Sequence, residues 1–160
     1  MPTANQNRGT LLFDAIYLAA GEKLGREVGR KAMIILTDGA DFGSQVKLQD
    51  AIEAAQKADA ICYVLLIADR GFYGGFGYTG DRDMKKLVEE AGGRLIDVGH
   101  KYEKLKEAFD QIARELRSQY SIGYTPSDAK RDGSFRRIEI KNLQGHKVQA
   151  RRGYYTRREP

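Results

Sequence analysis

The apolar run at residues 32–36 constrains the fold more than any other stretch of the sequence. It has no polar alternation, and it stops abruptly at Thr37, Asp38 and Gly39. Such a run is typical of a strand covered on both faces, as in parallel sheets with helices above and below. Functional carboxylates in open α/β sheets lie at the carboxyl ends of strands, which makes Asp38 a candidate site residue. An ordinary turn aspartate before a glycine is the alternative.

Helix and strand patterns alternate along the chain. Apolar runs at residues 60–68 and 94–98 predict two further strands. Four helices are expected. The first starts after Thr10 as N-cap, the second ends near residue 57, the third covers 81–91, and the fourth contains the apolar stripe between residues 105 and 116. The side chains expected to face the core are Leu12, Ile16, Ala19, Ala20, Ala51, Ile52, Ala55, Met84, Leu87, Val88, Ala91, Leu105, Phe109, Ile112 and Leu116. This order predicts an α/β fold with a parallel sheet and right-handed crossovers.

The end of the chain has a different pattern. Residues 120–124, 135–141 and 147–150 are expected to form three strands, the last two around a turn at 142–145. Because their connections are short, we expect these strands to be antiparallel. The sequence therefore predicts an antiparallel extension behind a mostly parallel sheet.

Charge is unevenly distributed along the 160 residues, which suffice for one domain with its own core. The net charge is +5, but residues 130–160 carry ten Lys/Arg against three Asp/Glu and the rest is close to neutral. With Tyr154 and Tyr155 among arginines, this end could hold phosphates and stack on bases. A solvated hairpin with basic edges is the commoner explanation, so we do not expect nucleic acid as a partner.

Several classes of function find no support in the sequence. It contains no P-loop, no nucleophile elbow, no Cys/His pair and no zinc-protease motif, so we expect no catalysis. The single cysteine, Cys62, lies in an apolar run and is expected to be a small buried hydrophobe. The apolar runs are too short to span a membrane. The first residues are polar, and the compartment cannot be deduced from them.

A glycine-rich loop is expected at residues 69–80. Its end matches G-x-G-x-x-G, but it starts several residues after the strand and precedes a helix that opens with Asp81 and Asp83, which would repel a pyrophosphate. Loops of this length are usually functional or disordered. Four aromatic side chains alternate with the glycines and are candidate ligand contacts: Phe72, Tyr73, Phe76 and Tyr78.

The sequence resembles the von Willebrand factor type A (VWA) domain in its bacterial, VWFA-related form. The resemblance rests on residues 9–16 (GTLLFDAI) and 34–41 (IILTDGAD), and on further matches at 87–96, 119–126, 132–136 and 152–155. It implies a Rossmann-like three-layer sandwich with helices on both faces. It also implies a metal-ion-dependent adhesion site, and it suggests an extracytoplasmic location in bacteria.

In that family the metal is held by Asp-x-Ser-x-Ser, a threonine before a helix and the aspartate of T-D-G. Thr10 and Asp38 match the last two, whereas Asp-x-Ser-x-Ser is missing, so the resemblance implies a domain truncated at its N-terminus. Asp41 is a further candidate ligand contact. Mg²⁺ prefers near-octahedral oxygen ligands, so with two protein ligands we expect Mg²⁺ or another divalent cation to bind weakly or not at all.

These observations favour a non-catalytic, adhesion-type module that recognises a protein partner, with residues 1–126 as a partial VWA-type domain and 127–160 as its basic hairpin extension. Two alternatives stay open: a nucleotide-binding enzyme that uses the loop at 69–80, and a nucleic-acid-binding module that uses the basic end. In the family's sheet the T-D-G strand pairs with a first strand that is missing here. We therefore expect residues 32–37 to form an exposed edge and to pair with a second copy as a homodimer.

Overall fold

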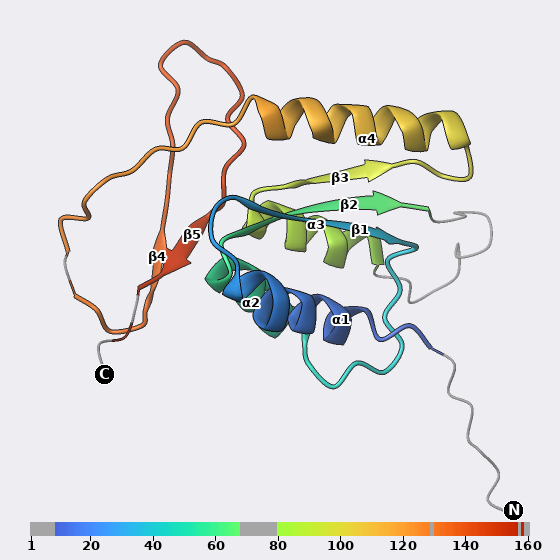
Figure 1. Ribbon diagram of the computed structural model, residues 1–160, viewed down its shortest axis with the longest axis horizontal. Coiled ribbons are helices and arrows are strands. Elements are labelled where there is room, and N and C mark those ends of the chain that lie inside the picture. Colours follow the sequence, from blue (N-terminus) through green and yellow to red (C-terminus); the bar gives the residue numbers. More distant parts are fainter. Residues whose placement is uncertain (1–8, 68–79, 129, 157, 159–160) are drawn as a thin grey trace, which may run out of the picture.

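The computed structural model describes residues 9–67, 80–128, 130–156 and 158. A mixed α/β body (residues 9–117) is followed by a C-terminal segment (residues 118–158) that contains a small hairpin (Figure 1). The elements of the body are α1 (Leu12–Leu18), a π-helical turn (Ala19–Lys23), a 3-10 turn (Leu24–Arg26), β1 (Lys31–Thr37), α2 (Leu48–Lys57), β2 (Ala60–Leu66), α3 (Gly80–Ala91), β3 (Arg94–Asp97) and α4 (Tyr102–Arg117). The hairpin consists of β4 (Phe135–Arg137) and β5 (Gly153–Tyr155).

The body is built on a three-stranded parallel sheet of order β1-β2-β3. Lys31 of β1 is in register with Ala60 of β2, and Tyr63 of β2 with Arg94 of β3. The central strand β2 is buried on both faces, which explains its unbroken apolar sequence. The predicted parallel strands and the helices between them are confirmed.

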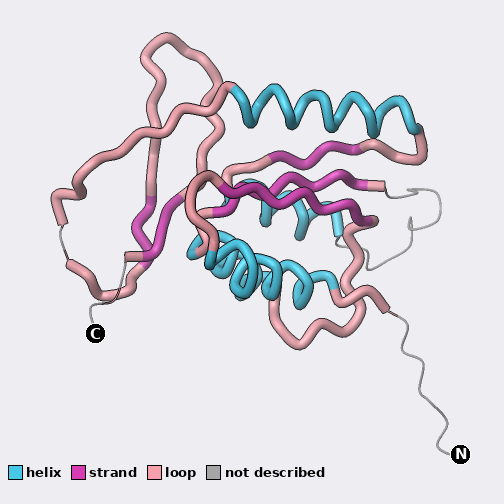
Figure 2. Tube along the Cα trace, viewed as in Figure 1, coloured by secondary structure: helices cyan, strands magenta, loops and turns pink. Residues whose placement is uncertain are grey.

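Helices cover both faces of the sheet, as Figures 1 and 2 show. On one face, α1, α2 and α3 pack against β1 and β2 in a cluster that includes Ile16, Ile52 and Leu87. On the other face, α4 packs Ala108 and Ile112 against β2 and β3. The core predicted from helical spacing is largely confirmed. Phe109, expected in the core, is instead 45% exposed, and its neighbour Ala108 is buried in its place.

The prediction that residues 32–36 are covered on both faces is wrong. Ile35 is buried beneath the helices, but Ile34 and Leu36 on the opposite face are 42% and 52% exposed. The cause is the position of β1 at the end of the sheet, because α4 lies over β2 and β3 and leaves this face of β1 uncovered. A long apolar run therefore did not distinguish an edge strand from a central one.

Cys62 is confirmed as a buried hydrophobe of β2. Burial raises the pKa of its thiol to about 12, so the thiol stays protonated at neutral pH. Gly93 lies directly against the Cys62 backbone, and a side chain at position 93 would collide with it. The absence of a side chain at Gly93 therefore lets the start of β3 approach β2 closely.

The C-terminal segment departs from the prediction. Its antiparallel pairing is confirmed, but β5 forms at 153–155 and not at 147–150, and no strand forms at 120–124. The turn after Asn142 does form, with the Asn142 side chain accepting a hydrogen bond from the Gln144 backbone at 2.8 Å. Aromatic packing favours the observed register, because the rings of Phe135 and Tyr155 lie 5.1 Å apart across the pair.

Candidate functional site

The candidate site lies at the carboxyl edge of the parallel sheet. β1 ends at Thr37 and β3 at Asp97, and between them the Ile67 amide after β2 donates to the Thr37 carbonyl at 2.9 Å. Since the strands are parallel, the loops that follow them meet at one edge. This is the edge at which the sequence predicted Asp38 to lie.

Asp38 forms a tight turn as soon as β1 ends. Its Oδ1 accepts a hydrogen bond from the Ala40 amide at 3.1 Å, while the Thr37 hydroxyl accepts one from the Gly39 amide at 3.0 Å. Gly39 has a φ of +86°, and a side chain there would lie 3.0 Å from the backbone of Gly80 at the start of α3. Thr37, Asp38 and Gly39 therefore form a turn that brings the carboxyl end of β1 against the start of α3.

Thr10 was predicted to be the N-cap of the first helix, and this is wrong. Leu11 occupies the N-cap position, and its side chain makes no capping hydrogen bond. The backbone carbonyl of Thr10 instead accepts a hydrogen bond from the Phe42 amide at 2.8 Å, and its side chain is exposed. Thr10 is thereby tied to the loop that follows Asp38.

Asp41, a candidate ligand contact, caps α1 across the loop. Its Oδ1 accepts from the Phe13 amide at 3.0 Å and from the Ser44 hydroxyl at 2.5 Å, and its Oδ2 accepts from the Ser44 amide at 3.2 Å. Burial acts to raise the pKa of the Asp41 carboxyl, but these hydrogen bonds outweigh it and hold the pKa below its usual value. Both oxygens of Asp41 are thus used in fixing α1 to the loop.

Two further residues at this site were assigned no role from the sequence. The Ser44 hydroxyl accepts from the amides of Phe13 and Asp14 at the start of α1. The Asp14 carboxylate, in return, accepts from the Gln45 amide at 2.9 Å and the Val46 amide at 2.9 Å. Asp and Ser are common cap residues, but their spacing gives no hint that they cap an element about thirty positions away.

The other candidate contacts, Phe72, Tyr73, Phe76 and Tyr78, lie outside the described residues, as does most of the loop at 69–80. Within the residues that are described, no group of three or more His, Cys, Asp and Glu side chains could hold a metal ion. Thr10 and Asp38 remain as the oxygen-bearing candidates at this edge.

The basic arginines lie at the opposite edge of the sheet. Arg151 forms an ion pair with Asp59, just before β2, and Arg152 pairs with Glu89 at 2.9 Å and Glu90 at 3.3 Å near the end of α3. The Arg152 amide also lies 3.4 Å from the Glu90 carbonyl. These arginines, a basis for the nucleic-acid alternative, therefore bind carboxylates of the same chain.

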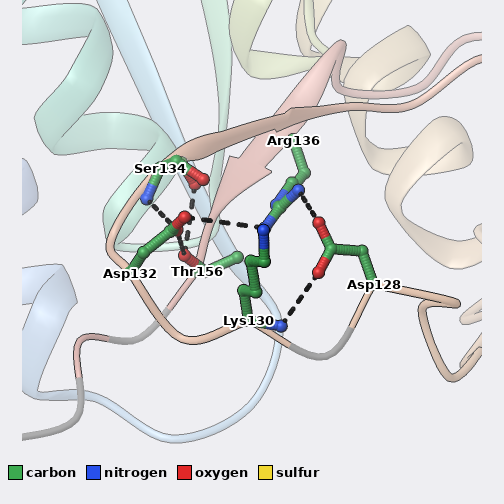
Figure 3. A network of polar contacts seen from close by, with 6 residues as sticks. All are labelled: Asp128, Lys130, Asp132, Ser134, Arg136 and Thr156. Atoms are coloured by element: carbon green, nitrogen blue, oxygen red, sulfur yellow. Dashed lines mark hydrogen bonds and ion pairs between the residues drawn. The ribbon is translucent and has the colours of Figure 1, made fainter.

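A second polar network closes the far end of the hairpin, as Figure 3 shows. Arg136 pairs with Asp128 at 2.6 Å and lies 3.8 Å from Asp132. Asp132 also accepts from the Ser134 amide at 2.9 Å and the Thr156 hydroxyl at 3.1 Å. The hydrogen bonds from Ser134 hold the pKa of the Asp132 carboxyl well below its usual value. The network joins the two strands and is structural in character.

Comparison with known proteins gave no match: no family model, no curated protein and no solved structure matches the chain. Among the described helices, none is both long and apolar enough to cross a membrane.

Proposed function

We propose that the chain is a non-catalytic protein-recognition module of the VWA type, and that its recognition surface is the carboxyl edge of the sheet. One observation carries the proposal: the segment before α1 and the loop after β1 are joined at this edge by the 2.8 Å hydrogen bond between the Thr10 carbonyl and the Phe42 amide. The two residues that match the family's metal site, Thr10 and Asp38, belong to these two segments.

The donor chemistry fits a weakly held hard cation. A threonine hydroxyl and an aspartate carboxylate are oxygen ligands of the kind that Mg²⁺ takes, and water or a partner's carboxylate would complete the shell. Asp41 supports the edge differently, because its hydrogen bonds hold α1, and with it Thr10, against the loop. The ion's part would be to attract an acidic group of the partner, and the residues of the chain would orient it.

NMR titration with MnCl₂ tests the metal site, because paramagnetic Mn²⁺ broadens nearby amides even when it binds weakly. The amides of Thr10 and Gly39 should broaden selectively in the wild type, and much less in Asp38→Ala. Asp97→Ala is the matched control, since Asp97 ends β3 at the same sheet edge and accepts from the Gly99 amide at 3.2 Å in the same type of turn.

A short peptide with an exposed carboxylate tests recognition. Its binding should shift the same amides in the presence of Mg²⁺ and be abolished by EDTA. Equal Mn²⁺ broadening in wild type and Asp38→Ala would contradict the metal site. Binding of ATP, or of a single-stranded oligonucleotide with a steep salt dependence, in place of the peptide would favour one of the two alternatives.

A further inference from the structure

The outer edge of β1 carries backbone groups without a strand partner. β1 is the terminal strand of the order β1-β2-β3, so within the described part of the chain it pairs with a strand on one side only. Such an edge is a template for pairing with another chain unless charge, proline or a bulge protects it. The strand, Lys31–Thr37, has a single lysine at its start and no proline.

The hydrogen bond of Thr37 shows which residues point outward. Its carbonyl accepts from the Ile67 amide after β2, so the backbone of Thr37 faces β2. Because the N–H and C=O groups of successive strand residues point to alternate sides, Met33 and Ile35 also face β2. Ala32, Ile34 and Leu36 therefore direct their N–H and C=O groups to the open side.

The same residues leave apolar side chains uncovered. Ile34 and Leu36 are 42% and 52% exposed, whereas Ile35 and Thr37, on the helix-covered face, are 9% and 7% exposed. Pairing through this edge with a second β1 would place Ile34 beside its equivalent and Leu36 beside Ala32. Cross-strand pairs of this type stabilise sheets.

The helix packed under β1 has an unpartnered apolar flank. Leu11, at its N-cap, and Leu18 are 48% and 55% exposed, and Ala15 between them is also exposed. Tyr17 lines the hollow between α1 and α2, and the three apolar residues lie about 130° around the helix from Tyr17. The flank therefore points away from α2, to the side of the molecule where the sheet ends at β1.

We propose that two copies of the chain associate through β1 to form one continuous sheet, with the two strands antiparallel about a two-fold axis at Ile34. In this register Ile34 lies opposite Ile34 of the second copy, and Ala32 lies opposite Leu36. All three outward-pointing residues then form hydrogen-bonded pairs, each of which exchanges two backbone hydrogen bonds. Lys31 lies opposite Thr37, so no like charges oppose each other.

The second copy is the occupant that this geometry fits. A two-fold contact uses the same patch on both partners and closes after two copies. The outward residues are arranged symmetrically about Ile34, and the apolar flanks of the two α1 helices meet beneath the joined sheet. Paired seven-residue strands alone make a small interface, and stable association needs about 1,200 Å² in total, so the helix flanks are a necessary part of it.

Light scattering after size exclusion, over a concentration series, tests the proposal. The wild type should approach twice the monomer mass at high concentration and dissociate on dilution in the micromolar range. Ile34→Pro removes an outward N–H and leaves the β1–β2 hydrogen bonds intact, so it should be monomeric. Leu18→Glu, an exposed substitution that the fold tolerates, should be monomeric as well. Leu143→Glu is the matched control, because Leu143 is fully exposed in the hairpin loop, and it should dimerise like the wild type.

Amide hydrogen exchange gives a second, residue-specific readout. In the dimer, the amides of Ile34 and Leu36 should be protected together with that of Ile35. On dilution, Ile34 and Leu36 should exchange rapidly while Ile35 stays protected by β2. A monomer at the highest concentration overturns the proposal, whether the outward amides exchange fast, as on a bare edge, or slowly, as under the chain's own residues. A dimer that persists in both Ile34→Pro and Leu18→Glu also overturns it.

Discussion

The body and the C-terminal segment are held in place by different forces. In the body, β2 and the helices around it bury apolar side chains almost completely, with Val64, Leu65 and Leu87 at 0% exposure. In the C-terminal segment, Tyr120 and Leu143 are 93% and 100% exposed, and the hairpin is three residues long on each side. Apolar burial supports the body, whereas ion pairs and a short ladder hold the segment.

This difference explains the charge asymmetry of the sequence. The basic segment lies against a body whose carboxylates, Asp59, Glu89 and Glu90, face its arginines. Its docking depends on the folded body, since the partners of Arg151 and Arg152 are placed by α2, β2 and α3. The uneven charge is therefore used at least in part inside the molecule.

Replacing a buried leucine of the body should show the largest difference in stability between the body and the C-terminal segment. Leu87→Ala removes side-chain atoms from the fully buried face of α3 and should lower the free energy of unfolding by about 2–5 kcal/mol. Leu143→Ala, the same change at a fully exposed position of the C-terminal segment, should shift it by less than about 0.5 kcal/mol. Urea unfolding followed by circular dichroism measures both. Similar losses for the two variants would show that the segment contributes a core of its own.

Asp41→Ala tests a polar contact within the body. It removes the acceptor for the Phe13 amide and for the Ser44 hydroxyl, so we expect a loss of about 1 kcal/mol in the same urea experiment, the usual cost of a missing helix cap. Asp110→Ala, an exposed change on α4, is the control and should have almost no effect. Equal stabilities of wild type and Asp41→Ala would mean that α1 is fixed by its apolar face alone.

The accuracy of the predictions from the sequence also differs between the body and the C-terminal segment. The body was predicted well because its signals are local: helical spacing in residues such as Met84, Leu87 and Val88, and an unbroken apolar run in β2. The exposed face of β1 could not be predicted, because it depends on where α4 packs. A run of apolar residues does not indicate which strands a distant helix will cover.

The strands of the C-terminal segment were misplaced for a related reason. Residues 147–150 alternate like a strand, but Gln149 donates to the Gly92 carbonyl and accepts from Arg94 in the body, and pairing moves to Tyr154 and Tyr155. At the candidate site, the position of Asp38 followed from the strand end. The roles of Asp41, Asp14 and Ser44 did not, since each caps or is capped across a long sequence separation.

Acid should loosen the far end of the hairpin. The pKa of Asp132 is lowered from 3.8 in the folded protein by hydrogen bonds from Ser134, so its stabilising contribution is complete well above pH 3.8 and is lost as the pH falls through the folded value. The amides of Ser134 and Thr156, followed by NMR from pH 7 to pH 1, should shift only below pH 3.8, while that of Leu65 stays constant. Asp132→Asn should remove the transition. A transition above pH 5, or one that the Asn variant retains, would contradict this assignment.

The smallest effect concerns the contact between the two regions. Arg152 reaches Glu89 and Glu90, but its side chain is 51% exposed, so a double-mutant cycle of Arg152→Ala with Glu89→Ala should give a coupling of about 0.2–1 kcal/mol. The coupling should shrink in about 1 M NaCl, where the Debye length is about 3 Å. Arg26 and Glu22, paired at 2.7 Å on one helical turn, form the matched control, because removing that pair should leave hydrogen exchange in the hairpin unchanged. Removing the Arg152 pair should speed exchange at the Ile138 amide, which donates to the Arg152 carbonyl at 2.8 Å. A coupling that resists salt would mean that the segment is anchored by more than charge.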